Sequence, residues 1–495
     1  MSLLGVDVGT NGCKAIILNT NGEVIARASR SYNLETPRPG WVELDADLVW
    51  ISIKQSIKEA VNSVPDDPVQ TIGVSAMGDT VTACDSNFNP LQNSIVAFDT
   101  RNIQDAEIFK KKFGKSGIFQ ITGQPVHPTY SITKIHWIKR NLPEIFYATD
   151  YFLCYEEFIT AKLCGNPITS YSTASRTMAF NIHQYCWWEE ILDFVDLSPD
   201  RLPLLGSSGS KAGLVLPAVA QELGLRKDVI VVVGGHDQPC GALACGLFDD
   251  GIVMDSTGTV EVLLLTTKTP MLTQEMLDAT ICFWPHVVQE EYCACGQILT
   301  AGAAFRWYCE QFGMHENDIS VFDAMTSGFS PEPANTLFIP HLSGSGTPEF
   351  NPAAKGALYG LTLNTDVFEI GKSILEGLCF ELKINIELLE NTGLLIDTIR
   401  AVGGAVKSDK WMQLKADITG KEIQACQLVD QCPQGAAILA GFGIGLFGTL
   451  SKSAGFLKSK YQTFSPNRDF TEAYDEKFQK YIKFRSVIFE LYDTL

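Results

Sequence analysis

Two segments far apart in the chain share one pattern, in which a short turn rich in glycine and threonine connects two strand-like runs. In the first, the apolar run Leu3–Val8 leads through Gly9-Thr10 to a second strand-like run at Lys14–Leu18. The same order recurs over residues 251–265, where a Ser-Thr-Gly-Thr turn separates two strand-like runs. Self-similarity of this kind, near the start and near the middle of a chain, predicts a duplicated fold.

The turn at Gly9-Thr10 joins two strands and not a strand and a helix. A further strand-like run follows at Glu23–Ala28, and Asn21-Gly22 before it is a strong hairpin signal, because both residue types tolerate positive φ. The chain contains no G-x-x-x-x-G-K-[ST] sequence, so it is not a P-loop protein.

Helical and strand-like patterns alternate along the rest of the chain. Leu48–Val61 and Ser131–Arg140 have helical spacing, while Thr71–Ala76 reads as a strand. Apolar residues from Ile374 to Leu389 predict a long amphipathic helix that ends at Asn391-Thr392-Gly393. Alternation of this kind indicates an α/β fold.

The length of the chain, 495 residues, exceeds what one hydrophobic core usually organises. We therefore expect two domains, residues 1–248 and residues 249–495, with the boundary just before the second turn. No low-complexity linker separates them, so we expect the two halves to face each other across a cleft.

Charge and composition narrow the classes of partner. The chain has 57 acidic and 38 basic residues, a net charge of −19, which argues against nucleic acid or an anionic membrane. A nucleotide is compatible with this balance, because backbone N–H groups and a bound cation can hold phosphates locally. The most apolar stretch, Ala436–Leu450, is too short to span a bilayer.

Fourteen scattered cysteines and a start without the features of a secretory signal indicate a cytoplasmic protein with buried thiols. Cys293-x-Cys295 is the one close pair, and the spacing of a metal site is missing around it.

The first turn could hold phosphate. Glycines at 9 and 12 let backbone N–H groups approach an anion, and Thr10, Asn11 and Lys14 add polar groups. Asp7, at the end of the strand, could hold Mg²⁺ through water. An isolated Asp-x-Gly-Thr is more often a polar β-turn, but the second turn, with Gly258-Thr259, favours two loops that clamp one polyphosphate from both sides.

A second candidate follows the apolar run 231–233, which ends in two glycines before His236-Asp237-Gln238. Polar residues at such a strand–helix junction lie at the mouth of an α/β cleft. Asp237 could accept a proton and Gln238 could bind a substrate hydroxyl, whereas His236 reads as a supporting residue. From this segment alone, Asp237 as the cap of the following helix is an equal alternative.

Two further segments could approach a nucleotide. Gly403-Gly404 ends a strand before Ser408 and a helical run at Trp411–Ile418, so a base or ribose could lie against bare backbone. The helical run Thr300–Trp307 has small residues on one turn, Gly302 among them. Tight helix packing explains the second pattern equally well.

Taken together and in this order, these segments resemble the FGGY family of carbohydrate kinases, within the sugar kinase, Hsp70 and actin superfamily. The resemblance covers nearly the whole chain. It rests on the Asp99-Thr100-Arg101 stretch and on the motifs DVGTNGCKAIIL, GWVELDADLVW, IGVSAMGDTVTACD, GGHDQPCGALACG, DSTGTV, AGAAFRW and AVGGAVKSDKWMQLKADITGKEI.

The resemblance implies two ribonuclease-H-like (actin-like ATPase) domains with ATP and Mg²⁺ in the cleft between them. It also implies that Asp237 is the catalytic base and that Asp7 serves the metal. The implied nucleotide contacts are Thr10, Asn11, Gly12, Lys14, Gly258, Thr259, Gly302, Arg306, Gly404 and Ser408. The implied sugar contacts are Met77, Gly78, Asp79, Asp99, Asp237 and Gln238.

The sugar segment departs from two better-known patterns. Glycerol kinases resemble N-Q-R-E-T here, so their Arg and Glu become Gly78 and Asp79, and xylulose kinases resemble G-Q-M-H-G, whose His falls on Asp79. Residues 76–80 carry no positive charge that a sugar acid would need. We therefore expect ATP-dependent phosphorylation of a neutral ketose such as xylulose, a related pentulose or a deoxyketohexose.

Alternatives are a gluconate or glycerol kinase, a chaperone-like ATPase or filament protein of the same superfamily, and a sugar sensor without catalysis. The sensor would be favoured by loss of Asp7 or Asp237, and both are present. A homodimer is compatible with the sequence, which leaves the sugar and its reacting hydroxyl open.

Overall fold

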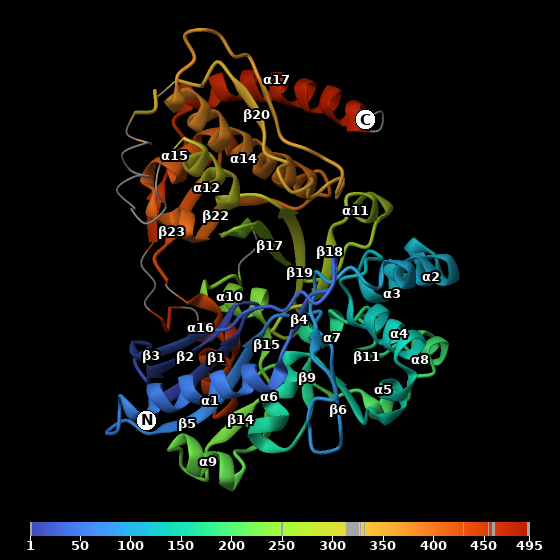
Figure 1. Ribbon diagram of the computed structural model, residues 1–495. Coiled ribbons are helices and arrows are strands. Elements are labelled where there is room, and N and C mark those ends of the chain that lie inside the picture. The colour runs from blue at the N-terminus through green and yellow to red at the C-terminus, as the bar shows by residue number, and fades with distance from the viewer. Residues whose placement is uncertain are drawn as a thin grey trace.

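The computed structural model describes residues 2–248, 251–312, 326, 328–330, 332–428, 430–453, 455–457 and 461–492. Two large sheets dominate it, one from each half of the chain, and helices lie between and outside them (Figure 1). The helices named below are α1 (Ala46–Asn62), α2 (Ile103–Phe113), α3 (Lys115–Thr122), α4 (Ser131–Asn141), α5 (Pro143–Ala148), α6 (Tyr155–Cys164), α7 (Tyr171–Ser175), α8 (Glu189–Val195), α9 (Pro217–Leu223), α10 (Asp237–Ala244), α11 (Gln274–Asp278), α12 (Gly302–Gln311), α14 (Val367–Glu390), α15 (Asp409–Thr419), α16 (Gln431–Gly443) and α17 (Arg468–Tyr492).

The first sheet has the order β13-β14-β5-β1-β2-β3, with β15 also paired to β5. Its strands are β1 (Ser2–Val8), β2 (Gly12–Asn19), β3 (Val24–Ser31), β5 (Val69–Ala76), β13 (Lys211–Leu214), β14 (Ile230–Val232) and β15 (Gly235–His236). β1, β2 and β3 are antiparallel neighbours, whereas β1, β5 and β14 run parallel. The predicted strand–turn–strand unit at Gly9-Thr10 is confirmed.

The second sheet repeats this arrangement. Its order is β18-β19-β17-β16-β22-β23-β24. Its strands are β16 (Gly251–Thr257), β17 (Glu261–Thr267), β18 (Cys282–Pro285), β19 (Tyr292–Ile298), β22 (Ile396–Gly403), β23 (Glu422–Cys426) and β24 (Tyr461–Phe464). β16 is antiparallel to β17 and parallel to β22, as β1 is to β2 and β5. The predicted duplication is therefore confirmed.

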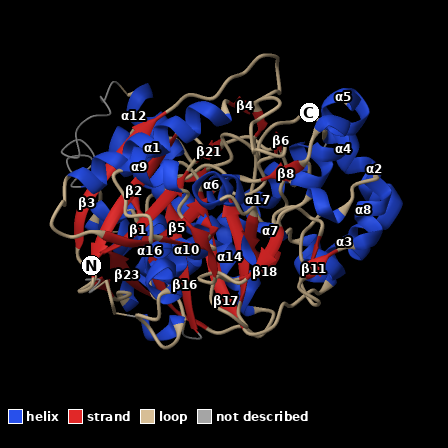
Figure 2. Cartoon of the chain, turned by 90° about the horizontal axis from the view of Figure 1, so that it is seen from below, coloured by secondary structure: helices blue, strands red, loops and turns tan. Residues whose placement is uncertain are grey.

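Smaller strand pairs complete the fold. They are β4 (Glu43–Leu44) with β7 (Ser94–Ile95), β6 (Thr82–Cys84) with β8 (Tyr151–Leu153), β9 (Ile168–Ser170) with β12 (Leu204–Gly206), β10 (Phe180–Asn181) with β11 (Cys186–Trp187), and β20 (Leu337–Ile339) with β21 (Ala357–Tyr359). Helices α2, α3, α4, α5 and α8 gather at one side of the chain, away from the two large sheets (Figure 2).

Alternation along the central strands sets the order of the layers. In β1, Leu4 packs in a core with α1 and α6, whereas Leu3 packs with α16 and α10. In β16, Val253 packs with α14, α15 and α17, whereas Met254 packs with α10. Helix α10 therefore lies between the two sheets, with apolar residues on both sides, such as Leu243 toward the first sheet.

Helix α16 comes from the second half of the chain but packs on the first sheet, where its orange-red ribbon lies beside the blue strands in Figure 1. The approach is backbone to backbone, because a Cβ on Gly5 would lie 1.8 Å from the carbonyl oxygen of Pro433, and one on Gly73 would lie 2.2 Å from that of Ala436. The expected division at 248/249, next to two residues outside the described part of the chain, assigns α16 to the second domain although it packs with the first.

The predicted hairpin at Asn21-Gly22 is confirmed, since β2 and β3 pair antiparallel on either side of it. In the hairpin between β2 and β3, Gly22 has a φ of 80° but Asn21 does not have a positive φ, because the Asn19 side chain accepts from the N–H groups of Asn21 and Glu23 and shapes a longer turn. The helix after the two glycines at 234 and 235 begins at Asp237.

The structure can be compared with two expectations from composition, which concern the cysteines and membrane-spanning segments. The fourteen cysteines are free thiols, and all except Cys186 and Cys432 are buried. Within the described ranges, we find no helix with the length and apolarity needed to cross a membrane.

A buried ionic cluster joins α15 to the strands on either side of the second Gly-Thr turn. The Lys415 ammonium donates to Asp255, to Thr257 Oγ1 at 2.8 Å and to Glu261 at 3.2 Å. Lys415 and both carboxylate side chains have no solvent exposure. Burial opposes the charge, but the two carboxylates raise the pKa of Lys415 above its ordinary range, so the lysine stays protonated.

We expect Lys415→Met to lower the free energy of unfolding by about 3–5 kcal/mol, because the substitution leaves two buried carboxylates without a counter-charge. Urea denaturation followed by circular dichroism measures this as a lower midpoint. The control is Lys410→Met, an exposed position at the start of the same helix, which should change stability by less than about 0.5 kcal/mol. Equal midpoints for the two variants would contradict the role of the cluster.

Candidate functional site

Three strand ends bring the main candidates to one edge of the first sheet. Asp7 of β1 and Gly235 of β15 both pair in register with Ser75 of β5. Asp237 follows Gly235 by two residues and is the first residue of α10. Parallel strands present their carboxyl ends at the same edge, so Asp7 and Asp237 lie two strands apart, about 10 Å between backbones.

The Asp237 carboxylate is partly open to solvent, with 26% of its side chain exposed. Its Oδ1 accepts from the N–H of Gln238 at 2.7 Å and lies 3.3 Å from Nε2 of His236. His236 occupies the cap position of α10, so Asp237 is not the cap residue that the alternative reading required. Burial lowers the pKa of His236 well below its ordinary value, and the imidazole is neutral.

The two carboxylates share an environment that disfavours negative charge. Burial raises the pKa of Asp7 to about 6, although a hydrogen bond of 2.9 Å from Ser75 Oγ and the charge of Lys14 oppose this. Burial, and next the charge of Asp7, raise the pKa of Asp237 from 3.8 to about 7. A carboxylate with a pKa near 7 is suited to accept a proton at neutral pH.

The first turn is closed by a hydrogen bond of 3.0 Å from the N–H of Gly9 to the carbonyl of Gly12. Tyr32 donates to the Gly9 carbonyl at 2.7 Å, and Thr10 Oγ1 contacts Met77 Sδ at 3.6 Å. Lys14 extends from this turn and pairs with Asp430 at 2.7 Å. The first turn therefore contacts Met77, one of the predicted sugar contacts.

The second Gly-Thr turn lies next to the two other segments that were predicted to contact a nucleotide, at Gly302 and at Gly403-Gly404. Gly302, the first residue of α12, donates to the carbonyl of Gly258 at 3.0 Å, and a Cβ on Gly302 would lie 2.5 Å from that oxygen. A Cβ on Gly403 would lie 2.4 Å from the Thr257 carbonyl, whereas one on Gly404 would meet no atom within 4 Å. The predicted residues Gly258, Gly302 and Gly404 therefore belong to one region.

The remaining predicted nucleotide contacts are a helix cap and residues at or near the surface. The Ser408 hydroxyl accepts from the N–H of Trp411 at 3.2 Å and caps α15, which gives it a structural task. Asn11, Thr259 and Arg306 are exposed, and Gly12 is half-buried.

The predicted sugar residue Asp79 is buried and ion-paired. Its Oδ2 accepts from Nη2 of Arg176 at 3.0 Å, while Oδ1 has no hydrogen-bond partner. Arg176 also donates to Gln124 at 3.2 Å, and its Cζ lies 5.1 Å from the ring of Trp284 on β18. Gly78 provides the room for this arrangement, because a Cβ there would lie 2.8 Å from Arg176 Cγ.

Asp99, another predicted sugar contact, is fully used inside the protein. Its two oxygens accept from the N–H of Val42 at 2.6 Å, from the N–H of Arg101 at 2.8 Å and from the Arg101 guanidinium. This carboxylate fixes the loop that follows β7, and its role as a sugar contact stays a prediction.

Sequence reasoning missed Arg176, Gln124 and Trp284. Arg176 lies 97 positions from Asp79, and no local pattern marks it. A buried arginine must be paired, but the sequence does not name its partner.

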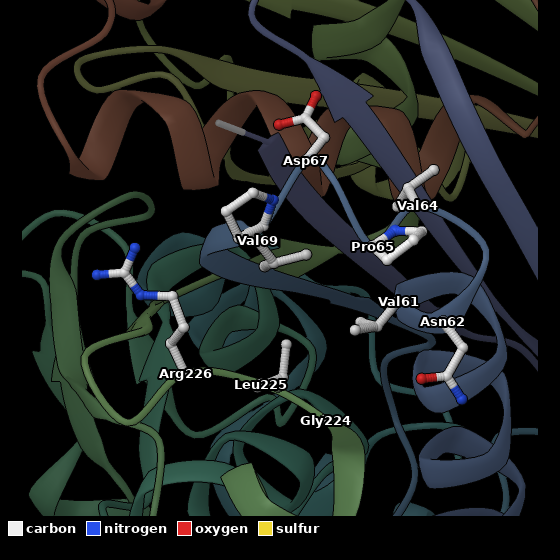
Figure 3. A pocket seen from close by; sticks show the side chains of 10 residues that line it. Val61, Asn62, Val64, Pro65, Asp67, Val69, Gly224, Leu225 and Arg226 are labelled. Atoms are coloured by element: carbon white, nitrogen blue, oxygen red, sulfur yellow. The ribbon is translucent and has the colours of Figure 1, made fainter.

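One pocket lies far from these residues. This pocket has a volume of about 240 Å³. Figure 3 shows side chains that line it, among them Val61, Asn62, Val69, Leu225 and Arg226. It lies at the start of β5, and His236 pairs with Ala76 at the other end of that strand. Seven residues of strand separate the two ends by about 23 Å, so the pocket has no part in the site.

The residues fit a nucleotide with its cation. Two hairpin turns with open backbone suit a polyphosphate, and the open space at Gly404 suits a base. Among the described residues, no group of three or more His, Cys, Asp or Glu side chains could hold a metal ion by itself. Asp7 fits the alternative, in which Mg²⁺ takes one or two carboxylates and completes its shell with water and phosphate.

Comparisons with known proteins identify the family of this chain. The N-terminal domain of the FGGY family of carbohydrate kinases matches residues 2–244, and its C-terminal domain matches residues 253–444. A xylulose kinase of Staphylococcus xylosus is 27% identical over 486 residues, 97% of this chain and 98% of the relative.

Solved structures share the fold. The xylulose kinase of Lactobacillus acidophilus has a TM-score of 0.92 at 23% identity, covering 100% of this chain and 99% of that one. The gluconate kinase of the same organism has a TM-score of 0.91 at 23% identity, covering 98% of each chain. The chain belongs to the FGGY family of carbohydrate kinases, enzymes that phosphorylate sugars with ATP as the phosphoryl donor.

Proposed function

We propose that this protein phosphorylates a hydroxyl of a small neutral ketose, a pentulose such as xylulose or a related deoxyketohexose, and that Asp237 is the general base. The observation that carries the proposal is the position of Asp237 in the first turn of α10, a helix packed between the two sheets. From there the carboxylate lies at the edge that also carries Asp7 and the first Gly-Thr turn.

In the proposed reaction, Asp237 orients the acceptor hydroxyl and takes its proton as the oxygen attacks the γ-phosphorus. Phosphoryl transfer depends on positioning and on neutralisation of charge, so the protein need not form a covalent bond. The turns at Gly9-Thr10 and Gly258-Thr259 hold the phosphates of the nucleotide. Gly404 leaves room for its adenine ring. When bound, Mg²⁺ neutralises phosphate charge, and Asp7 would hold it through water.

The charges around Asp79 support a neutral sugar over gluconate. Arg176 is the cation beside Asp79, and its charge is already balanced by the Asp79 carboxylate. Lys134, the next cation, donates to the carbonyls of Asp79 and Thr129 and is fully buried. A sugar carboxylate would have to compete with Asp79 for Arg176, whereas the hydroxyls of a ketose would not.

Replacement of Asp237 by Asn tests whether Asp237 is the general base. We expect Asp237→Asn to lower kcat for D-xylulose by about 10²–10⁴-fold, because the amide cannot accept the proton. Coupled detection of ADP measures kcat, and isothermal titration should give an ADP affinity within about threefold of wild type. The control is Asp228→Asn, an exposed carboxylate in the same half of the chain, which should keep wild-type kcat. Near-normal turnover of Asp237→Asn would refute the assignment.

The pH dependence follows from the raised pKa of Asp237. The base must be ionised, so kcat/KM for the sugar should rise with pH and level off above about pH 7. At pH 6 about a tenth of the base is ionised, and we expect roughly a tenfold loss. Initial rates between pH 5 and 9 measure the profile, with circular dichroism at each pH to confirm that the protein stays folded. A profile that stays flat down to pH 5 would show that the limiting base is not this carboxylate.

A further inference from the structure

An ion pair joins the first phosphate turn to a residue from the far end of the chain. Lys14 Nζ lies 2.7 Å from Asp430 Oδ1, and 416 positions separate the two residues. The Lys14 side chain is 49% exposed and that of Asp430 is 17% exposed. A partly exposed ion pair of this kind contributes little to the stability of the fold, so stability does not explain why the pair lies here.

The packing of α16 fixes Asp430 beside the first turn. Asp430 immediately precedes α16, with a φ of 63°, and its side chain makes no capping bond to the helix. The start of the helix is held on the sheet by the close approach of Pro433 to Gly5, two residues before Asp7. The anchored start of α16 therefore places Asp430 beside Lys14.

Lys14 has a second acidic neighbour that matters for the reaction. In the antiparallel register of β1 and β2, Lys14 stands directly opposite Asp7. Side chains opposite each other on antiparallel strands lie on the same face, with Cβ atoms about 4.5–5.5 Å apart. Lysine is long and flexible, so without another partner its ammonium would fold onto the Asp7 carboxylate.

A pair between Lys14 and Asp7 would remove two groups that the proposed function needs. The ammonium would no longer face the phosphates, and the carboxylate would no longer be open to the cation. We infer that Asp430 is a positioning residue that holds Lys14 away from Asp7, so that Lys14 serves the nucleotide phosphates and Asp7 stays open to the metal ion. The inference rests on the proposed roles of Lys14 and Asp7.

A double-mutant cycle on ADP binding tests the inference without using turnover. Isothermal titration would give the Kd of ADP with Mg²⁺ for wild type, Asp430→Asn, Lys14→Met and the double variant. Asn tolerates the positive φ of position 430 as Asp does, so the fold is kept. We expect Asp430→Asn to weaken ADP binding about fivefold, the change that corresponds to about 1 kcal/mol.

The same substitution in the Lys14→Met background should change the Kd by less than about twofold, because no ammonium remains to fold onto Asp7. The matched control is Glu222→Gln, which removes an equally short ion pair, 2.7 Å to Lys54, at a distant surface and should leave the Kd unchanged. The KM for the sugar should stay at the wild-type value in Asp430→Asn, since Asp237 and Arg176 are untouched.

Three outcomes would overturn the inference. An unchanged Kd in Asp430→Asn, beside a weakened Lys14→Met, would show that Asp430 does not position Lys14. Equal weakening by Asp430→Asn in both backgrounds would show that Asp430 acts without Lys14. An unchanged Kd in Lys14→Met would remove the phosphate role of Lys14 itself, a failure of the proposed function that the first two outcomes do not imply.

Discussion

Helix α10 has apolar side chains on two opposite sides, and the two large sheets pack against those sides. Leu243 packs with the first sheet and Ala242 packs with the second. The first residue of this helix must then lie where the strand ends of the first sheet meet the space between the halves. The strand before Asp237 marks it in the sequence, and core packing sets its position in the fold.

The close packing of α16 on the first sheet has a similar consequence. Glycines at 5 and 73 let the backbones approach to distances that any side chain would prevent. The helix carries Asp430 to the Gly9-Thr10 turn, so two distant parts of the chain meet there. The charges of Asp430 and Lys14 act on Asp7, and the charge of Asp7 acts on Asp237, so these four residues are electrostatic neighbours.

Much of this fold could be predicted from the sequence because its signals are local. The two Gly-Thr turns, the helix that ends near Asn391 and the strand before the glycines at 234 and 235 depend on neighbouring residues. The layer order could not be predicted, because it depends on which face of each strand meets which helix. Asn21 shows the limit at short range, since one Asn19 side chain changed the turn.

Some residues of the candidate site could be predicted from local patterns, and others could not. Asp237 and the two turns were found because their polar residues follow apolar strands. The Arg176–Asp79 and Lys14–Asp430 pairs were not, because each joins residues far apart in the chain. Asp99 was assigned to the sugar by resemblance, and its bonds to Val42 and Arg101 give it a structural task.

The central claim is that a neutral ketose is the acceptor. The most direct measurement compares kcat/KM for ADP release over ketopentoses, deoxyketohexoses, tetritols, glycerol and gluconate, each with MgATP. We predict that a neutral ketose gives the highest value and that gluconate is at least tenfold poorer, because Asp79 already occupies Arg176. Gluconate as the best acceptor, or no sugar-dependent ADP release with any of them, would contradict the account.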